Sequence, residues 1–344
     1  MNDFYLEKIK PYADKIKAYI SGEEFREFFK SVNGEYLYNN YYDYFLKHTI
    51  GGKCVRGYLI FLFTKLFGGS ETQATLKAAT ALELFESAVL MHDDIIDYGR
   101  IRRGMPSAYV ALGDDHTGKS RAICLGDAGL ITAIALLEDC PAEVRRFLTT
   151  IFLRTISGEL ADIDVATKRE IADNDVIAVY IEKTATYTLL APCMCGALLC
   201  GKVSEETATA IEKYATYMGI SFQIKDDLLG LFGNETVIGK NGDADIAEGK
   251  KSLLVSRFDN VATADQKRIF YGIYGKGAPT AEDAETIRKL FTESGSREYA
   301  EKKMLDYYEK ASAQKDILVN LVKPSEDTKK ELQDFTCYLI KRKK

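Results

Sequence analysis

Proline is scarce in this chain, with only six residues among 344. Because proline removes a backbone donor and breaks helices, so low a content permits long uninterrupted helices. Alternating apolar and polar patterns, which are typical of strands, are also scarce, and no segment predicts a confident hairpin. With 46% hydrophobic residues the chain has ample material for a large core. The sequence therefore predicts an all-α protein.

Other features that the sequence lacks exclude whole classes of protein. The seven cysteines are odd in number and lie in a long chain, which argues against a disulfide scaffold, and Cys193, Cys195 and Cys200 have no second ligand cluster for zinc. A net charge of −5 lacks the basic excess of a nucleic-acid binder. The sequence has no run of about 18 or more apolar residues, so it predicts no membrane span. Its amino terminus shows no signal peptide pattern. We expect a cytoplasmic protein with no nucleic-acid partner and no integral membrane segment.

Three segments show helical spacing of apolar residues. The segment 70–91 repeats them every three or four positions, with Ser70 as the expected N-cap and Gln73 as its capping-box partner. The segments 205–231 and 174–201 are similar, and we expect a kink at Pro192 in the latter.

The first of these helices runs into a cluster of carboxylates, His92-Asp93-Asp94-Ile95-Ile96-Asp97. Asp93 and Asp97 are four residues apart and so share one helix face. Three carboxylates this close repel one another unless cations balance them, and oxygen ligands of this kind suit magnesium. A solvated acidic helix end is the simpler interpretation. However, the apolar helix before the cluster and the pair Arg102-Arg103 after it favour a site for magnesium and a polyanion such as diphosphate.

A second pair of aspartates, Asp226-Asp227, also ends an apolar helix, and a glycine-containing loop with lysines follows it. Further cations occur at Lys53 and Arg56, near a probable helix start that favours anions, and at Lys183 within a helix. A surface salt bridge would explain any one of these cations. Together with two carboxylate clusters, they indicate two diphosphates and a set of magnesium ions.

These elements, in this order over residues 51–251, resemble the trans-isoprenyl diphosphate synthases. The resemblance implies one all-α domain over residues 1–344, a bundle of long helices around a deep central cavity (the isoprenoid synthase fold), usually as a homodimer. It implies a prenyltransferase that condenses isopentenyl diphosphate with an allylic diphosphate, with about three Mg²⁺ ions. Ionisation of the allylic diphosphate, attack by isopentenyl diphosphate and proton loss to the released diphosphate would follow, without a protein nucleophile.

The resemblance also assigns roles residue by residue. The implied metal ligands are Asp93, Asp94, Asp97, Asp226 and Asp227. The residues implied to bind the allylic diphosphate are Arg102, Lys183, Lys240 and Lys250. The residues implied to bind isopentenyl diphosphate are Lys53, Arg56 and Arg103, and those implied to line the path of the carbocation are Thr184 and Gln223.

The chain departs from the family pattern at four positions. Gly230 stands where many members have a third aspartate in the second motif, which places more weight on Asp226. Glu86 stands where many have a histidine near isopentenyl diphosphate, and a carboxylate there repels diphosphate unless it pairs with a cation. Gly57 replaces a proline and Cys54 an arginine.

The residues before the first motif are implied to form the floor of the product pocket. Ala88 and Val89 are small, which argues for a product longer than farnesyl diphosphate. Phe85 would then end the pocket near geranylgeranyl length. If Phe85 only packs in the core, longer chains are open. Tyr38, Tyr41 and Phe45 could also line the floor from another helix.

Several other functions remain open at this point. A farnesyl diphosphate synthase differs only in product length. A class I terpene cyclase shares the metal chemistry but has no use for the cations expected to hold isopentenyl diphosphate. A non-catalytic subunit would be expected to lose the aspartates, and a cation-binding scaffold leaves the ordered arginines and lysines unexplained.

Overall fold

The computed structural model describes residues 3–201, 203–233 and 244–341. Within them almost all regular structure is helical, which confirms the all-α prediction. The chain divides into two compact units: residues 1–152, 191–208 and 322–335 form the first, and residues 153–190, 209–321 and 336–344 form the second. Each unit is described by itself.

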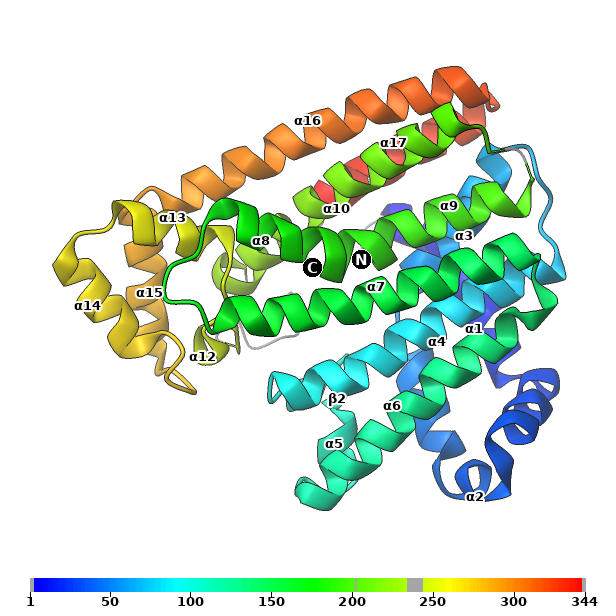
Figure 1. Cartoon of the computed structure of the whole chain (residues 1–344), viewed down its shortest axis with the longest axis horizontal. Helices are drawn as coiled ribbons and strands as arrows, with labels where there is room; N and C mark the ends of the chain where they lie inside the picture. Colours follow the sequence, from blue (N-terminus) through cyan, green and yellow to red (C-terminus); the bar gives the residue numbers. More distant parts are fainter. Residues whose placement is uncertain (1–2, 202, 234–243, 342–344) are drawn as a thin grey trace. The chain divides into compact units, whose positions relative to one another are not determined.

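The first unit begins with a π-helix, continues through six α-helices with a short hairpin, and regains one helix later in the chain (Figure 1). Its elements are η1 (Tyr5–Ile9), α1 (Lys10–Ser21), α2 (Glu23–Ile50), α3 (Val55–Leu66), α4 (Gln73–Ile96), β1 (Ile101–Arg102), β2 (Met105–Pro106), α5 (Ala108–Ala111), α6 (His116–Leu136), η2 (Leu137–Asp139) and α9 (Ala191–Leu199). Helix α4 is its centre, because α3 and α6 both pack against it and nearly every face of it is buried.

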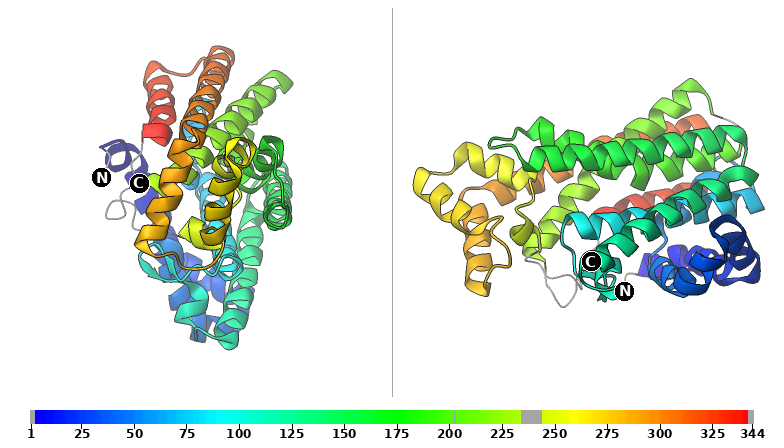
Figure 2. Two further views of the ribbon diagram at one scale, coloured as in Figure 1. Left: turned by 90° about the vertical axis from the view of Figure 1, so that its left-hand side faces the viewer. Right: turned by 60° about the horizontal axis from the view of Figure 1, so that its bottom comes forward.

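The second unit holds α8 (Asp173–Val179), η3 (Tyr180–Leu190), α12 (Ala244–Glu248), α13 (Leu253–Val261), α14 (Ala264–Ile273), α15 (Ala281–Glu293) and α16 (Ser296–Val322). Three helices run from one unit into the other: α7 (Ala142–Ala166), α10 (Glu205–Phe232) and α17 (Glu326–Lys341). Helices α13, α14 and α15 gather at one end of the second unit (Figure 2), where Phe258, Phe270 and Phe291 stack edge to face or tilted in the core.

The predicted long helices are confirmed, with corrections at their ends. The predicted helix 205–231 is α10. Helix α4 begins at Gln73 rather than just after Ser70, because Thr72 is the N-cap and forms the capping box with Thr75. The predicted cap at Ser70 was wrong, since the Thr72 hydroxyl rather than the Ser70 hydroxyl accepts the first-turn N–H.

Two irregular features were not predicted. The segment 174–201 contains an 11-residue π-helix, η3, immediately before Pro192, where only a proline kink was expected. The hairpin of β1 and β2 turns at Arg103-Gly104, and both residues have positive φ (54° and 75°). Positive φ at both central residues is what a tight hairpin turn needs, although arginine rarely adopts it.

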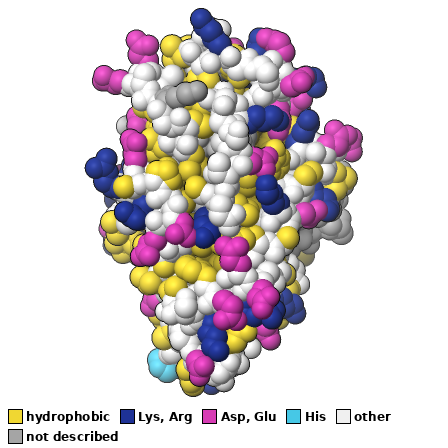
Figure 3. Space-filling model, turned by 90° about the vertical axis from the view of Figure 1, so that its right-hand side faces the viewer, with side chains coloured by type: hydrophobic (Ala, Val, Ile, Leu, Met, Phe, Trp, Pro, Cys, Tyr) yellow, Lys and Arg dark blue, Asp and Glu magenta, His cyan; other side chains and the backbone are white. Residues whose placement is uncertain are grey.

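Thiols and apolar helices also have defined places. All seven cysteines are free; of the three in the apolar run 193–200, which the sequence predicts as buried thiols, Cys193 and Cys195 are buried and Cys200 is only partly buried. One helical stretch, His116–Asp139, is long and apolar enough to cross a membrane by length and composition, and core helices satisfy the same test. On the face drawn in Figure 3, the basic and acidic side chains of the described residues are interspersed rather than separated by sign.

Candidate active site

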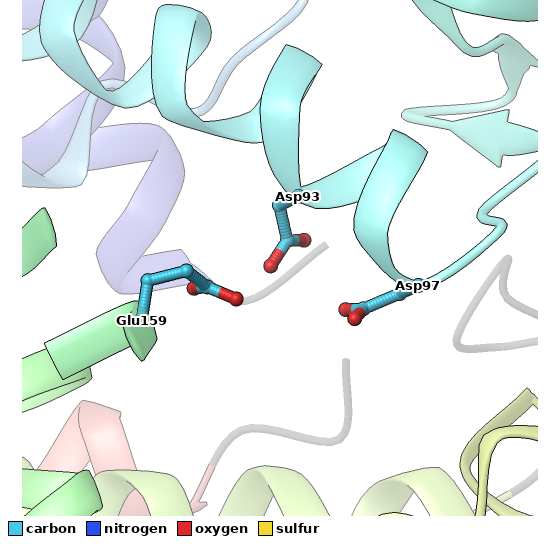
Figure 4. Close-up of side chains that lie close together, drawn as sticks. All are labelled: Asp93, Asp97 and Glu159. Atoms are coloured by element: carbon cyan, nitrogen blue, oxygen red, sulfur yellow. The ribbon is translucent and has the colours of Figure 1, made fainter. Parts of the chain in front are cut away.

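The first aspartate cluster lies at the C-terminal end of α4. Asp93 and Asp97 project from the same side of the helix (Figure 4), and each offers a carboxylate oxygen within 4.8 Å of the other's. Both side chains are partly exposed. Two partly exposed carboxylates at this separation can share one hard divalent cation, whose remaining positions would go to water or phosphate oxygen.

Asp94 has a different environment, because its side chain is fully buried. Arg102, on β1, donates to Asp94 Oδ1 from Nε at 2.9 Å and from NH2 at 2.6 Å, and also to Asp93 Oδ2 at 2.9 Å. The hairpin therefore carries the arginine expected to bind diphosphate directly onto the aspartate cluster. These charge-assisted hydrogen bonds from one guanidinium hold the Asp94 and Asp93 carboxylates in place.

Arg103, at the turn of the same hairpin, reaches a second set of expected residues. Its NH1 donates to the His48 carbonyl at 2.9 Å, and its NH2 lies 3.4 Å from Glu86 Oε1. A Cβ on Gly52 would lie 3.0 Å from the same guanidinium, so the Gly51-Gly52 turn packs closely on Arg103. Arg56 NH1 pairs with Glu86 Oε1 at 2.6 Å. Lys53 is exposed in the turn before α3.

The second aspartate pair lies near the C-terminal end of α10, in the second unit. Asp226 is partly exposed, whereas Asp227 is buried. Asp227 accepts hydrogen bonds from Tyr180, from Gln223 Nε2 at 3.0 Å and from Lys250 Nζ at 2.9 Å. Burial raises the pKa of Asp227, and Lys250 partly offsets that rise. Asp227 is thus satisfied by protein groups, and Asp226 is the more accessible carboxylate of the pair.

Lys250 is held by this arrangement. Burial alone would lower its pKa, but the charges of Asp227 and Asp245 keep it well above the usual range, so the ammonium stays charged. Lys240, also expected to bind diphosphate, lies outside the described residues.

The π-helix η3 carries the remaining expected residues. Lys183 Nζ lies 2.7 Å from Asp162 Oδ2 and 2.9 Å from Glu159 Oε2, both on α7. Thr184 Oγ1 donates to Gln223 Oε1 at 2.8 Å. Single π-turns often mark functional sites, because the extra residue per turn changes which side chains point inward. Here the π-helix places Thr184 beside Gln223, and Gln223 in turn touches Asp227.

Asp245 explains the missing third aspartate of the second motif. Its Oδ2 would lie 2.6 Å from a Cβ built on Gly230, so its carboxylate occupies the space where a side chain at 230 would begin. Asp245, Glu159, Asp162 and Tyr180 are polar residues of this region that sequence reasoning missed. Asp245 lies on α12, and only its three-dimensional position relates it to Gly230.

Restoring aspartate at position 230 should therefore destabilise the protein. We expect Gly230→Asp to lower the free energy of unfolding by about 1–3 kcal/mol, because it crowds Asp245 and adds a like charge. Adding Asp245→Ala should recover most of that loss in urea unfolding. Gly272→Asp is the matched control, since a Cβ there meets nothing within 4 Å. Equal losses at positions 230 and 272 would contradict this explanation.

The expected pocket-floor residues lie on α4 in the first unit. Phe85 is fully buried and stacks face to face on Phe152, with ring centroids 3.9 Å apart and planes inclined by 6°. Ala88 is fully buried, and its Cβ would be 2.9 Å from a Cβ on Gly129, whereas Val89 is partly exposed. Phe152 is a further residue that sequence reasoning missed, because the pair joins α4 to α7 across 67 positions of the chain.

Known proteins resemble this chain over most of its length. The model of the family described as Polyprenyl synthetase matches residues 35–291 of this chain. The chain is 30% identical to the geranylgeranyl diphosphate synthase of Sulfolobus acidocaldarius, covering 100% of this chain and 99% of that one. It is 32% identical to the geranylgeranyl diphosphate synthase of Methanosarcina mazei over 78% of this chain and 80% of the relative.

Among solved structures, the geranylgeranyl pyrophosphate synthase of Corynebacterium glutamicum, complexed with isoprenyl diphosphate and magnesium, aligns with a TM-score of 0.85 at 24% identity, covering 97% of this chain and 99% of that one. The predicted isoprenoid synthase fold is confirmed by this likeness. The profile match and the full-length relative together show that this chain belongs to the polyprenyl synthetase family.

Proposed function

We propose that this protein is a magnesium-dependent trans-prenyltransferase. It condenses isopentenyl diphosphate with an allylic diphosphate and makes geranylgeranyl diphosphate or a somewhat longer product. The observation that carries the proposal is the carboxylate cluster of α4 with Arg102 seated on it, because clustered oxygen ligands beside a guanidinium suit a metal–diphosphate complex. The names of the full-length relatives favour the geranylgeranyl product.

The residues fit magnesium by their donor chemistry. Asp93 and Asp97 would hold the first magnesium ions, and Asp226 would hold a further one, giving about three ions in all. Phosphate oxygens of the substrate would complete the coordination of these ions. Asp94 supports the first cluster through Arg102, and Asp227 supports the second through Lys250. When bound, Mg²⁺ would neutralise the charge that builds up on the leaving diphosphate.

The cationic side chains share that task. Arg102 donates to Asp93 and Asp94 here, and a guanidinium beside metal-binding carboxylates suits a diphosphate. Lys183, Lys250 and the loop lysine Lys240 would bind the allylic diphosphate with it. Lys53, Arg56 and Arg103 would hold the diphosphate of isopentenyl diphosphate. The Thr184 hydroxyl and the Gln223 amide, already in contact, offer dipoles rather than full charges to the carbocation.

The reaction then needs no protein nucleophile. The allylic C–O bond breaks, and its electron pair leaves with the diphosphate. The double bond of isopentenyl diphosphate attacks the allylic cation and forms the new C–C bond. The released diphosphate takes the proton that the resulting cation loses, which restores the double bond.

Release of inorganic diphosphate distinguishes this proposal from a class I terpene cyclase. With Mg²⁺ and an allylic diphosphate alone, we expect almost no release, and addition of isopentenyl diphosphate should start it. Equal release in the absence of isopentenyl diphosphate would favour the cyclase. No release under either condition would favour a non-catalytic subunit.

A homodimer is part of the proposal. Four apolar side chains of α7, Leu153, Ile156, Leu160 and Ile163, are 40–63% exposed and recur at intervals of three, four and three residues. This spacing forms one apolar stripe along a helix, as helix–helix interfaces do. The seven free cysteines suit the reducing cytoplasm, where we propose that the protein acts.

Charging this stripe should separate the subunits. We expect Leu153→Glu combined with Leu160→Glu to shift the mass in light scattering from two chains to one. Ile317→Glu, at a 46% exposed isoleucine on α16, is the matched control and should remain dimeric. A double variant that keeps the wild-type mass would place the interface elsewhere.

A further inference from the structure

A buried acidic pair lies beneath the arginines proposed to hold isopentenyl diphosphate. Glu83 and Glu86 are three residues apart and therefore lie on the same face of α4. Glu86 stands where a histidine was expected from the family resemblance. A carboxylate beside an anion site needs an explanation, because it repels the ligand that the site is built to hold.

Glu86 is paired with both arginines at once. Its Oε1 lies 2.6 Å from Arg56 NH1 and 3.4 Å from Arg103 NH2, and all three side chains are only 13–15% exposed. Burial alone would raise the pKa of Glu86, but Arg56 and then Arg103 hold it below its usual value, so the carboxylate is ionised. Two cations therefore already share one internal anion.

Glu83 is the protonated member of the pair. It is 2% exposed, and burial followed by the charge of Glu86 raises its pKa to about 8. Its Oε1 accepts the Gly57 N–H at 2.8 Å. Gly57 stands where a proline was expected, and a proline has no N–H to donate. The departures at Gly57 and Glu86 thus both involve this acidic pair.

The other titratable groups around this pair have fixed charge near neutral pH. Burial, then Arg103, lowers the pKa of His48 on α2 to about 4, so its ring is neutral. Burial raises the pKa of the Cys54 thiol well above its usual range, and the positive charge of Lys17 on α1 offsets only part of that rise. Among the described residues identified around the arginines, the acidic pair is therefore the group whose protonation can change near neutral pH, because the pKa of Glu83 is about 8.

We propose that Glu86 is an internal counter-ion that occupies Arg56 and Arg103 until the diphosphate of isopentenyl diphosphate binds, and that the Glu83–Glu86 pair then takes up one proton. This inference rests on the proposed function of the arginines. The incoming diphosphate carries more negative charge than Glu86 and takes over both guanidinium groups. The displaced carboxylate, left buried without its cations, is more stable when protonated.

The consequence is an affinity for isopentenyl diphosphate that weakens as the pH rises. Uptake of one proton makes the dissociation constant rise by up to about tenfold per pH unit between the pKa of Glu86 in the free site and its higher pKa in the complex, and the dependence levels off above the higher value. The terminal phosphate has its second pKa near 6, so pH 7–9 separates its own titration from that of the acidic pair.

Glu86→Gln tests the proposal, with Glu86→Asp as the conservative control. We expect Glu86→Gln to lower the KM for isopentenyl diphosphate about tenfold at pH 8 and to flatten its pH dependence, while the KM for the allylic primer is unchanged. Glu86→Asp should keep the wild-type slope. Calorimetric binding of inorganic diphosphate in buffers of different ionisation enthalpy should show about one more proton taken up by the wild type than by Glu86→Gln, because the titration of the ligand itself is common to both.

Each outcome decides the matter. A higher KM for isopentenyl diphosphate in Glu86→Gln, with the fold intact by circular dichroism, would overturn the proposal and make Glu86 a residue that only positions the arginines. An unchanged pH slope or equal proton uptake would overturn the protonation step. If the wild type shows no elongation with isopentenyl diphosphate, the proposed function fails instead, whereas calorimetry with inorganic diphosphate still tests the pair.

Discussion

Asp93→Ala is expected to lower turnover by about 10³-fold or more, because a partly exposed carboxylate that shares a cation with Asp97 is lost. The fold should survive, since Arg102 keeps its two hydrogen bonds to Asp94. Elongation assays at several magnesium concentrations measure the effect. Higher magnesium should recover only part of the activity, because one ligand of the site is missing.

Asp43→Ala is the matched control for this experiment. Asp43 is an exposed aspartate on α2 in the same unit, so its loss removes the same charge without touching the cluster. We expect the turnover of this variant to stay within about twofold of the wild type, since surface substitutions away from the active site and the core have small effects. Wild-type turnover in Asp93→Ala would refute the metal role of that residue.

Phe85→Ala is expected to lengthen the product by one or more five-carbon units. The ring is fully buried on Phe152, and its removal opens space on α4 about two turns before Asp93, on the side of the helix proposed as the pocket floor. Chromatography of the dephosphorylated products measures the chain length. Phe152→Ala should have the same direction of effect, because it removes the other half of the stacked pair.

The stability cost of this substitution calls for its own control. Loss of a buried phenylalanine costs about 3–5 kcal/mol, so Phe85→Leu, which leaves a smaller cavity, provides a milder variant. Phe63→Ala, at an equally buried ring of α3, should destabilise the protein similarly and leave the product unchanged. An unchanged product in both Phe85 and Phe152 variants would mean that their stacking is core packing and that the floor lies elsewhere.

Features set by local sequence were predictable. The apolar repeat of α4, the aspartates at its end and the helix α10 follow from patterns within a few turns. The cap of α4 was misplaced by two residues because Ser70 and Thr72 offer the same hydroxyl chemistry, and only the backbone conformation of Thr72 selects it.

Features set by distant residues were not predictable. The sequence near Lys183 does not predict its contacts with Glu159 and Asp162. The sequence near Gly230 does not predict its contact with Asp245 either, because such contacts form only when separate helices pack together. The hairpin was missed because Arg103 adopts a positive φ that its residue type disfavours. The sequence could not show whether Glu86 pairs with a cation, and the structure shows that it pairs with both Arg56 and Arg103.

Incubation of the protein with Mg²⁺, isopentenyl diphosphate and each allylic primer in turn, followed by measurement of product chain length, tests the central claim most directly. We predict elongation that stops mainly at geranylgeranyl diphosphate or slightly beyond, and that chelation of the metal abolishes it. A product that stops at farnesyl diphosphate would correct the chain length alone. No elongation from any primer would contradict the assignment of this chain as a prenyltransferase.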